Sequence, residues 1–171
     1  MTSGTMAVHF GGVPRAEMRT RLRRAGVQLN DHAEILLQQA VFDAPVDRSG
    51  VVVERSVAEL GLNDGGTLGA VFSAAEARGL ALVPMEAAPW IRLATLSQQN
   101  APDDVISAHR APTGSVTIAS APITDDVEFP KGFYLRVIGD VVWLRGYRCD
   151  ATYEFGPEQV FLFAIPSWGA A

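Results

Sequence analysis

Cysteine and lysine are nearly absent from this sequence, which has one of each, Cys149 and Lys131. A single cysteine excludes an internal disulfide. The formal net charge of −5 argues against a polycationic protein that binds nucleic acid through bulk charge. No apolar run approaches the roughly 20 residues that span a bilayer, and no signal peptide is recognisable at the N-terminus. We therefore expect a cytoplasmic protein with no membrane contact.

The sequence also lacks the motifs of the common enzyme classes. It contains no Gly-rich phosphate loop, no dinucleotide fingerprint, no G-x-S-x-G motif and no H-E-x-x-H motif. Its three histidines, His9, His32 and His109, are scattered, whereas metal ligands cluster at short spacings. The sequence therefore predicts no metal and no cofactor, and it leaves open whether the protein is an enzyme.

Length and composition indicate one globular domain. Apolar residues make up 48% and charged residues 19% of the 171 residues, ordinary values for a chain with a sizeable core. Residues 1–12 are mostly small and end in two glycines, so we expect a flexible N-terminal tail. Residues 13–171 are expected to form a single α+β domain that contains a long polar loop at 96–112.

A pair of helices is expected in the first forty residues. Pro14 suits the start of a helix and Gly26 its end, and Asp31 with Glu34 forms a capping box before a second helix. A helix pair joined by a short turn can read DNA, but the second helix, which would enter the groove, carries acids and no arginine or lysine. We therefore interpret the five arginines of the first helix as a solvated face, and nucleic-acid binding is not expected.

Residues 67–95 form the centre of the predicted fold. Thr67 is a good N-cap, and the apolar residues after it recur at helical spacing until Gly79, which suits a left-handed helix end. Residues 80–83 form a short apolar run, and residues 90–95 alternate in polarity, so both are predicted to be strands. These three elements must pack on one another to bury their apolar faces.

The second half of the chain has the period of two that is typical of strands. Residues 133–138 and 141–145 flank Gly139 and Asp140, which suit a two-residue hairpin turn. The helices are concentrated in the first half. The predicted class is therefore α+β, with the N-terminal helical pair and a central helix packed on one face of an antiparallel, meander-like sheet of about five strands.

The predicted hairpin carries the best binding-site candidate. With the strands paired across the turn, Arg136 stands opposite Trp143, and Tyr134 and Arg145 extend the same face. Two guanidiniums and two aromatic rings on one face can grip an anionic or aromatic ligand, or the acidic surface of a partner. The alternative is a solvent-facing sheet with cross-strand cation–π pairs.

Three further residues are candidates for chemistry. Glu86 is held between two prolines, where a carboxylate can move a proton, although a turn or capping role is the alternative. His109 shares the long loop with acids and can act as a general base, against the alternative of a solvated loop histidine. Arg148 beside Cys149 can lower the pKa of the thiol, but adjacent strand residues point to opposite faces.

Part of the chain resembles a group of uncharacterised bacterial proteins. The matching segments read SVAELGL, DGGTL, GLALVPME and PWIRL, and the group carries "ELGF-DGAT" before a helix, "GLxLCPxExGPxLRL" after it, and a closing hairpin with a tryptophan. The resemblance covers residues 50–165, implies one continuous domain and no known activity, and adds weight to Glu86 and Arg92 as positions to test. The chain departs from the group at Val83, where cysteine is frequent, and by the insertion-like loop 98–112.

Two functions of different class follow as hypotheses. The first is a small bacterial binding protein that acts on another macromolecule, as an immunity protein or a regulator does. The second is an enzyme or binding protein for a small anionic or aromatic molecule, in which Arg92, Arg136 or Arg145 holds the anion and Glu86 or His109 moves a proton. The second hypothesis requires the arginines to line one concave site.

Overall fold

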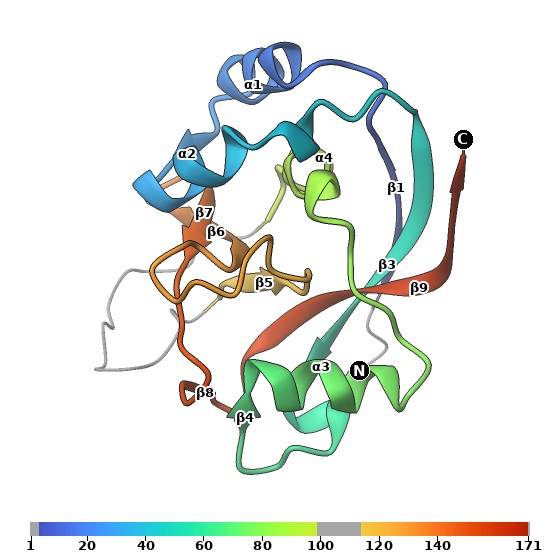
Figure 1. Cartoon of the computed structure of the whole chain (residues 1–171), viewed down its shortest axis with the longest axis vertical. Coiled ribbons are helices and arrows are strands. Elements are labelled where there is room, and N and C mark those ends of the chain that lie inside the picture. Colours follow the sequence, from blue (N-terminus) through green and yellow to red (C-terminus); the bar gives the residue numbers. More distant parts are fainter. Residues whose placement is uncertain (1–3, 99–113, 171) are drawn as a thin grey trace.

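The computed structural model describes residues 4–98 and 114–170, shown in Figure 1. Its helices are α1 (Arg15–Arg24), α2 (Asp31–Leu37), α3 (Leu68–Glu76) and α4 (Ala88–Ala94), with 3₁₀ turns η1 (Ala40–Phe42), η2 (Ala58–Leu60) and η3 (Met85–Ala87). Its strands are β1 (Thr5–Phe10), β2 (Gln28–Leu29), β3 (Arg48–Ser56), β4 (Gly66–Thr67), β5 (Val116–Ile118), β6 (Gly132–Ile138), β7 (Val141–Tyr147), β8 (Glu154–Phe155) and β9 (Val160–Ala170). The predicted α+β class and N-terminal helical pair are confirmed. None of the described helices is long and apolar enough to cross a membrane.

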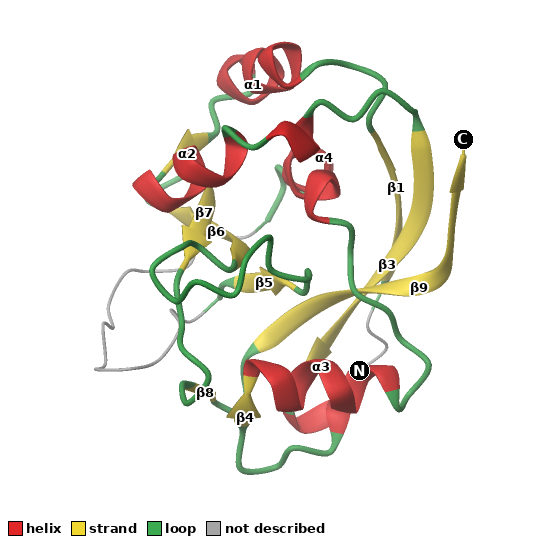
Figure 2. Ribbon diagram, in the orientation of Figure 1, coloured by secondary structure: helices red, strands yellow, loops and turns green. Residues whose placement is uncertain are grey.

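The large sheet has seven strands in the order β1-β3-β9-β5-β6-β7-β2, and β4 and β8 form a separate pair (Figure 2). Most neighbours are antiparallel, but β5 runs parallel to β9 and β2 runs parallel to β7. The predicted antiparallel meander of about five strands is therefore wrong in both number and topology. The reason is that β9 inserts between β3 and β5, where its residues 161–164 are buried on both faces.

The first strand corrects the expectation of a flexible tail for residues 5–10, while residues 1–3 lie outside the described residues. Thr5–Phe10 pairs antiparallel with β3 in unbroken register. Met6, Val8 and Phe10 pack on the hydrophobic core, and Val8 and Phe10 are buried. Burial of these alternating apolar side chains offsets the entropy lost when the segment is ordered.

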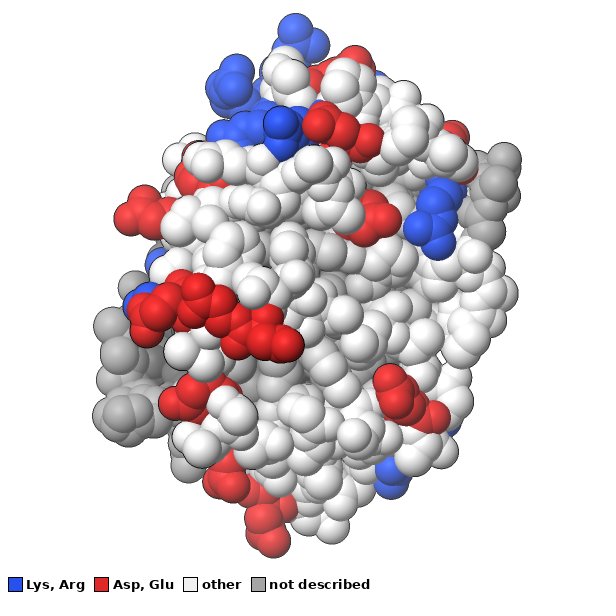
Figure 3. Space-filling view, in the orientation of Figure 1, with Lys and Arg blue, Asp and Glu red and all other residues white. Residues whose placement is uncertain are grey.

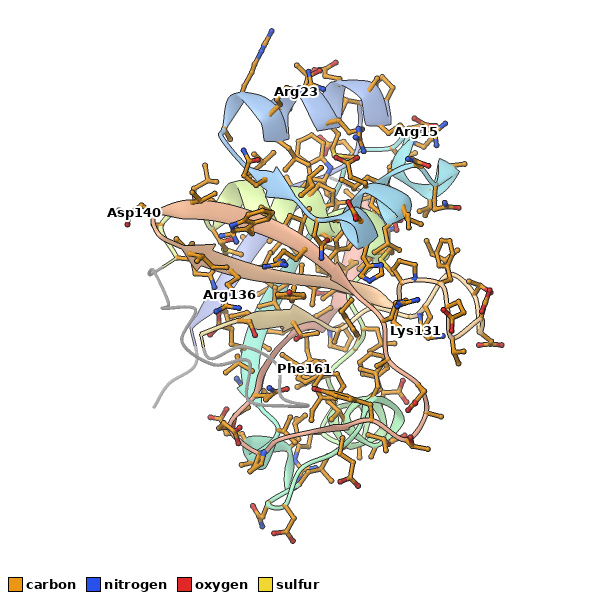
Figure 4. The ribbon with its side chains drawn as sticks, turned by 90° about the vertical axis from the view of Figure 1, so that its left-hand side faces the viewer. Arg15, Arg23, Lys131, Arg136, Asp140 and Phe161 are labelled. Carbon is orange, nitrogen blue, oxygen red and sulfur yellow. The ribbon has the colours of Figure 1, made fainter. Side chains whose placement is uncertain are left out.

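The helices α1, α2 and α4 cover one face of the large sheet. Their buried side chains join Phe133, Leu135 and Leu144 of the β6–β7 hairpin in one hydrophobic cluster. In Figure 4, α1 lies above this hairpin and is marked by Arg23. The hairpin face under these helices is therefore closed by the core, and a binding site on β6 and β7 must use the opposite face.

The central helix α3 packs on that opposite face, over β9. Thr67 caps it as predicted, since its hydroxyl accepts a hydrogen bond of 3.2 Å from the Ala70 N–H. Val71 of α3 packs in one cluster with Phe161 and Phe163, which alternate along β9 with residues of the first cluster. The helices therefore lie on both faces of the sheet, and the prediction of a single helical layer is wrong.

The two strands predicted after the central helix are not formed. Residues 90–95 belong largely to α4, which has Pro89 in its first turn, a position that suits the fixed φ and missing N–H of proline. Residues 80–83 make one isolated bridge, from Ala81 to β9. The buried residues Ala88, Ile91 and Arg92 stand three and four positions apart, so the segment packs on the core with helical rather than alternating periodicity.

Charge is unevenly spread over the face in Figure 3, where basic side chains gather at the top over α1 and acidic ones predominate below. Three ion pairs join α1 arginines to acids: Arg15 with Asp43, Arg19 with Glu34, and Arg21 with Glu17. Exposed pairs of this kind contribute little stability. The three ion pairs agree with the interpretation of the α1 arginines as a solvated helix face.

The pairing of β3 with β9 is interrupted at Gly50. Ser49 pairs with residue 169 and Val51 with Ile165, so Gly50 alone faces the three residues 166–168. The bulge brings the ring of Trp168 over Gly50, and the same ring packs on Phe10 with a centroid distance of 5.4 Å. A Cβ on Gly50 would lie 2.2 Å from the indole.

Gly50→Ala is therefore expected to lower the free energy of unfolding by about 2 kcal/mol, because the indole must leave its place on Phe10. Urea unfolding measures the effect. Gly69→Ala is the matched control, since nothing lies within 4 Å of a Cβ at that exposed helical glycine, and it should be neutral or stabilising. Equal unfolding midpoints for the two variants would contradict the assigned role of Gly50.

Candidate functional site

The β6–β7 hairpin forms as predicted around Gly139 and Asp140. Their φ angles are 54° and 64°, the positive values of a type I′ turn, whose twist matches that of the flanking strands. Ile138 consequently pairs with Val141, and the register continues along both strands. The local turn therefore fixes which side chains stand opposite one another.

Four side chains share the hairpin face that is turned away from α1, α2 and α4. Tyr134 pairs with Arg145 and Arg136 pairs with Trp143, the cross-strand relation that the sequence predicted. We call these four residues the β6–β7 face. Figure 4 shows Arg136 below the hairpin, on the side opposite to α1.

Arg145 is held in place by two aromatic rings of this face. Its guanidinium carbon lies 5.0 Å from the ring centroid of Trp143 and 5.9 Å from that of Tyr134. Among the described residues no carboxylate pairs with it, and its buried Nε has no hydrogen-bond partner there. A guanidinium in this position is stabilised by the ring quadrupoles and keeps donors for an incoming acceptor.

Arg136 is less accessible than the rest of the β6–β7 face. It is only 3% exposed, whereas Tyr134, Trp143 and Arg145 are half-buried. Arg136 is engaged in interactions within the chain, as a buried guanidinium must be. The face therefore presents one guanidinium, that of Arg145, where the sequence predicted two.

A pocket of about 200 Å³ adjoins the β6–β7 face at Tyr134, and we call it the tyrosine pocket. It is lined by Thr117, Tyr134, Tyr147, Arg148, Cys149, Tyr153 and Phe155. A turn at Asp150 places Tyr153 and Phe155 at the pocket. The Asp150 carboxylate accepts hydrogen bonds from Thr152 and from the Tyr153 N–H. These bonds hold the pKa of Asp150 below its ordinary value. The turn chemistry of an aspartate before a threonine is the sequence signal that our prediction missed.

Three groups of the tyrosine pocket, Tyr147, Cys149 and Tyr153, have raised pKa values. Burial raises the pKa of the Tyr147 hydroxyl, and the nearby Cys149 adds to the shift. Burial also raises the pKa of the Cys149 thiol, against the opposing charge of Lys131. Arg148 pairs with Glu128 at 2.8 Å. The predicted activation of Cys149 by Arg148 therefore has no support, because a nucleophilic cysteine needs a lowered pKa.

Arg92 of α4 is fully buried and lies on the face of the sheet that α1, α2 and α4 cover. Its guanidinium donates to the Thr95 carbonyl at 2.6 Å, to the Trp143 carbonyl at 2.9 Å and to the Gln98 side chain at 2.9 Å. Burial lowers its pKa to about 10, so it is still charged at neutral pH. Arg92 thus ties the end of α4 to β7. The second hypothesis requires Arg92 and Arg145 to line one site, and they lie on opposite faces of the sheet.

Of the two catalytic candidates, Glu86 and His109, only Glu86 lies among the described residues. Glu86 lies in η3 and is half-buried, with its carboxylate 3.7 Å from the Arg48 guanidinium of β3. His109 lies outside the residues that the structure describes. Over residues 4–98 and 114–170, no three His, Cys, Asp or Glu side chains are grouped so that they could hold a metal ion. Glu86 is therefore an ion-pair partner in this structure.

Comparisons with protein-family models, with curated proteins and with solved structures found no match to this chain. The resemblance to uncharacterised bacterial proteins stays a prediction. The β6–β7 face and the tyrosine pocket are therefore the two candidate sites of this chain.

Proposed function

We propose that the chain is a non-catalytic binding protein whose β6–β7 face receives another protein, one with acidic and apolar side chains at its surface. The observation that carries the proposal is the position of Arg145 over the rings of Trp143 and Tyr134. Tryptophan, tyrosine and arginine are the residues that contribute most to binding energy at protein interfaces. Their rigid rings and fixed donors lose little conformational entropy on binding.

The same geometry disfavours two other occupants of the β6–β7 face. A nucleic acid needs several guanidiniums or ammoniums to neutralise its phosphates, whereas this face presents Arg145 and keeps Arg136 buried on a protein of net charge −5. A substrate needs convergent catalytic groups, but Glu86 is paired with Arg48, and Arg92 lies on the other side of the sheet. Binding of a protein surface needs only a small group of well-packed residues at the centre of the interface, and Arg145 with the rings of Trp143 and Tyr134 forms such a group.

Native mass spectrometry of gently purified protein tests the proposal. We expect a co-purifying polypeptide with the wild type, and Arg145→Ala should lower the bound fraction at least tenfold, because loss of a central arginine typically costs about 2 kcal/mol of binding energy. Arg23→Ala is the matched control, since Arg23 is exposed on α1 on the other side of the sheet. Its complex should equal that of the wild type.

Two outcomes would contradict the proposal. One is a bare monomer for the wild type and both variants. The other is a complex that Arg145→Ala leaves unchanged while thermal unfolding shows that the variant is folded. A co-purifying small molecule in place of a polypeptide would favour the second hypothesis from the sequence, and its mass would identify the compound.

A further inference from the structure

We infer that the tyrosine pocket binds a small planar aromatic compound that carries a hydrogen-bond acceptor, such as a carbonyl oxygen. The inference does not depend on the proposed protein partner. It uses a different set of residues, which share only Tyr134 with the β6–β7 face. Three features of the pocket favour such a ligand: its volume, its aromatic walls and one buried hydroxyl.

The volume of the tyrosine pocket sets the size of the ligand. The pocket holds about 200 Å³, and an apolar cavity of about 150 Å³ is known to take benzene. Sites for drug-sized molecules and larger cofactors have about 300–1,000 Å³. One substituted ring therefore fits inside the pocket.

The walls of the pocket favour an aromatic ring over an aliphatic one. Phe155 meets Tyr153 edge to face, with centroids 5.0 Å apart and planes at 81°, and it meets Tyr147 in the same way at 6.4 Å and 85°. Behind them Phe155 packs on the buried Phe161 at 5.0 Å. Such a cluster presents both ring faces and ring edges, so a flat π system gains contacts that a saturated ring does not.

One buried polar group calls for an acceptor on the ligand. The hydroxyl of Tyr147 is buried, and no hydrogen-bond partner for it exists among the described residues. Gly132 stands across from Tyr147, and a Cβ there would lie 3.3 Å from the phenol ring, so the ring packs against the Gly132 backbone. A buried hydroxyl without a partner is costly. An oxygen acceptor on the ligand would satisfy it.

The charges around the pocket are nearly balanced, which favours a neutral ligand. Arg148 lines the pocket, but its guanidinium pairs with Glu128 at 2.8 Å. Lys131 and Asp150 act on the ionisation of Cys149 in opposite directions. The pocket therefore favours benzamide-like compounds over charged aromatic ones.

Cys149 offers a direct measurement of pocket occupancy, because it lines the pocket and is the only cysteine in the chain. The rate at which iodoacetamide alkylates it would be measured with increasing benzamide. We expect saturable protection of at least fivefold, with a Kd of about 1 mM for a fragment of this size. Cyclohexanecarboxamide has the acceptor without the aromatic plane, and toluene has the ring without the acceptor. Both should protect less than benzamide.

Tyr147→Phe is the decisive variant, since it removes one oxygen atom and keeps the ring. It should raise the Kd of benzamide about tenfold and leave that of toluene unchanged. Protection is taken as the ratio of rates with and without probe within each variant, because Cys149 lies near enough to Tyr147 to act on its ionisation. Arg145→Ala should not change benzamide binding, which separates the pocket from the β6–β7 face.

The inference is overturned if none of the three probes slows alkylation or raises the melting temperature. It is also overturned if cyclohexanecarboxamide protects as well as benzamide, or if Tyr147→Phe binds benzamide like the wild type. The melting temperature serves as the second readout, since a ligand that binds only the folded state must raise it.

Discussion

Arg92→Ala should lower the free energy of unfolding by about 4 kcal/mol, the largest effect that we expect from one substitution. The side chain is fully buried and donates to three acceptors, among them the carbonyls of Thr95 and Trp143. Alanine would leave a cavity and remove the donors from both carbonyls. Urea unfolding followed by tryptophan fluorescence and by circular dichroism would measure the loss.

Two further substitutions at this position separate volume from hydrogen bonding. Arg92→Met keeps most of the volume and loses the donors, so we expect about half of the alanine effect. Arg92→Lys keeps the charge but presents a single ammonium, and it should fall between the wild type and methionine. A loss below about 1 kcal/mol for alanine would contradict a structural role for Arg92. Any folded Arg92 variant should retain partner binding at the β6–β7 face.

Asn30→Ala should cost about 3 kcal/mol of unfolding free energy, because one amide group performs three tasks. The Asn30 carbonyl oxygen accepts from the Ala33 N–H at 2.9 Å, which caps α2, and from the Gly146 N–H at 2.8 Å. Its NH₂ group donates to the Gly146 carbonyl at 3.0 Å. The side chain thereby continues the ladder of β2 along β7 for one more step. Urea unfolding of the variant would measure the cost.

Asn30→Asp is the control, because it keeps the acceptor and removes the donor. The cap of α2 and the bond from the Gly146 N–H should survive. A carboxylate oxygen would, however, face the Gly146 carbonyl oxygen in place of the NH₂ group, so we expect a loss of about 2 kcal/mol. The backbone at Gly146 is packed tightly against α2, since a Cβ there would lie 2.6 Å from the carbonyl carbon of His32. Equal losses for the alanine and aspartate variants would show that the cap and the Gly146 N–H bond contribute nothing measurable.

Features set by neighbouring residues could be predicted from the sequence. The turn at Gly139 and Asp140 determines the hairpin register, so the cross-strand pairs of the β6–β7 face were predicted correctly. The same holds for the cap of α3 by Thr67, whose hydroxyl accepts a hydrogen bond from the Ala70 N–H. In each case a few adjacent residues supply both the signal and the structure.

Features set by distant residues could not be predicted. Arg92 is predicted from the sequence to bind a ligand. Its structural role is not visible there, because its contact with β7 joins positions 51 apart in the sequence. The tyrosine pocket forms where Thr117 of β5 lies near Tyr153 from the turn after β7, and no local sequence pattern predicts that these residues line one pocket. The strand Thr5–Phe10 was missed for a different reason, since its alternation is visible but too short to separate a strand from a tail.

The position of β9 has a consequence for the order in which the protein acquires its structure. Within the large sheet β9 alone connects β1 and β3 to the four strands β5, β6, β7 and β2, and it pairs Val53 with Phe163, 110 positions later. During translation the two groups of strands therefore emerge first, each with an open edge that invites pairing with other chains. Contacts so distant in sequence form slowly. The sheet becomes continuous only when the ribosome has released residues 160–170.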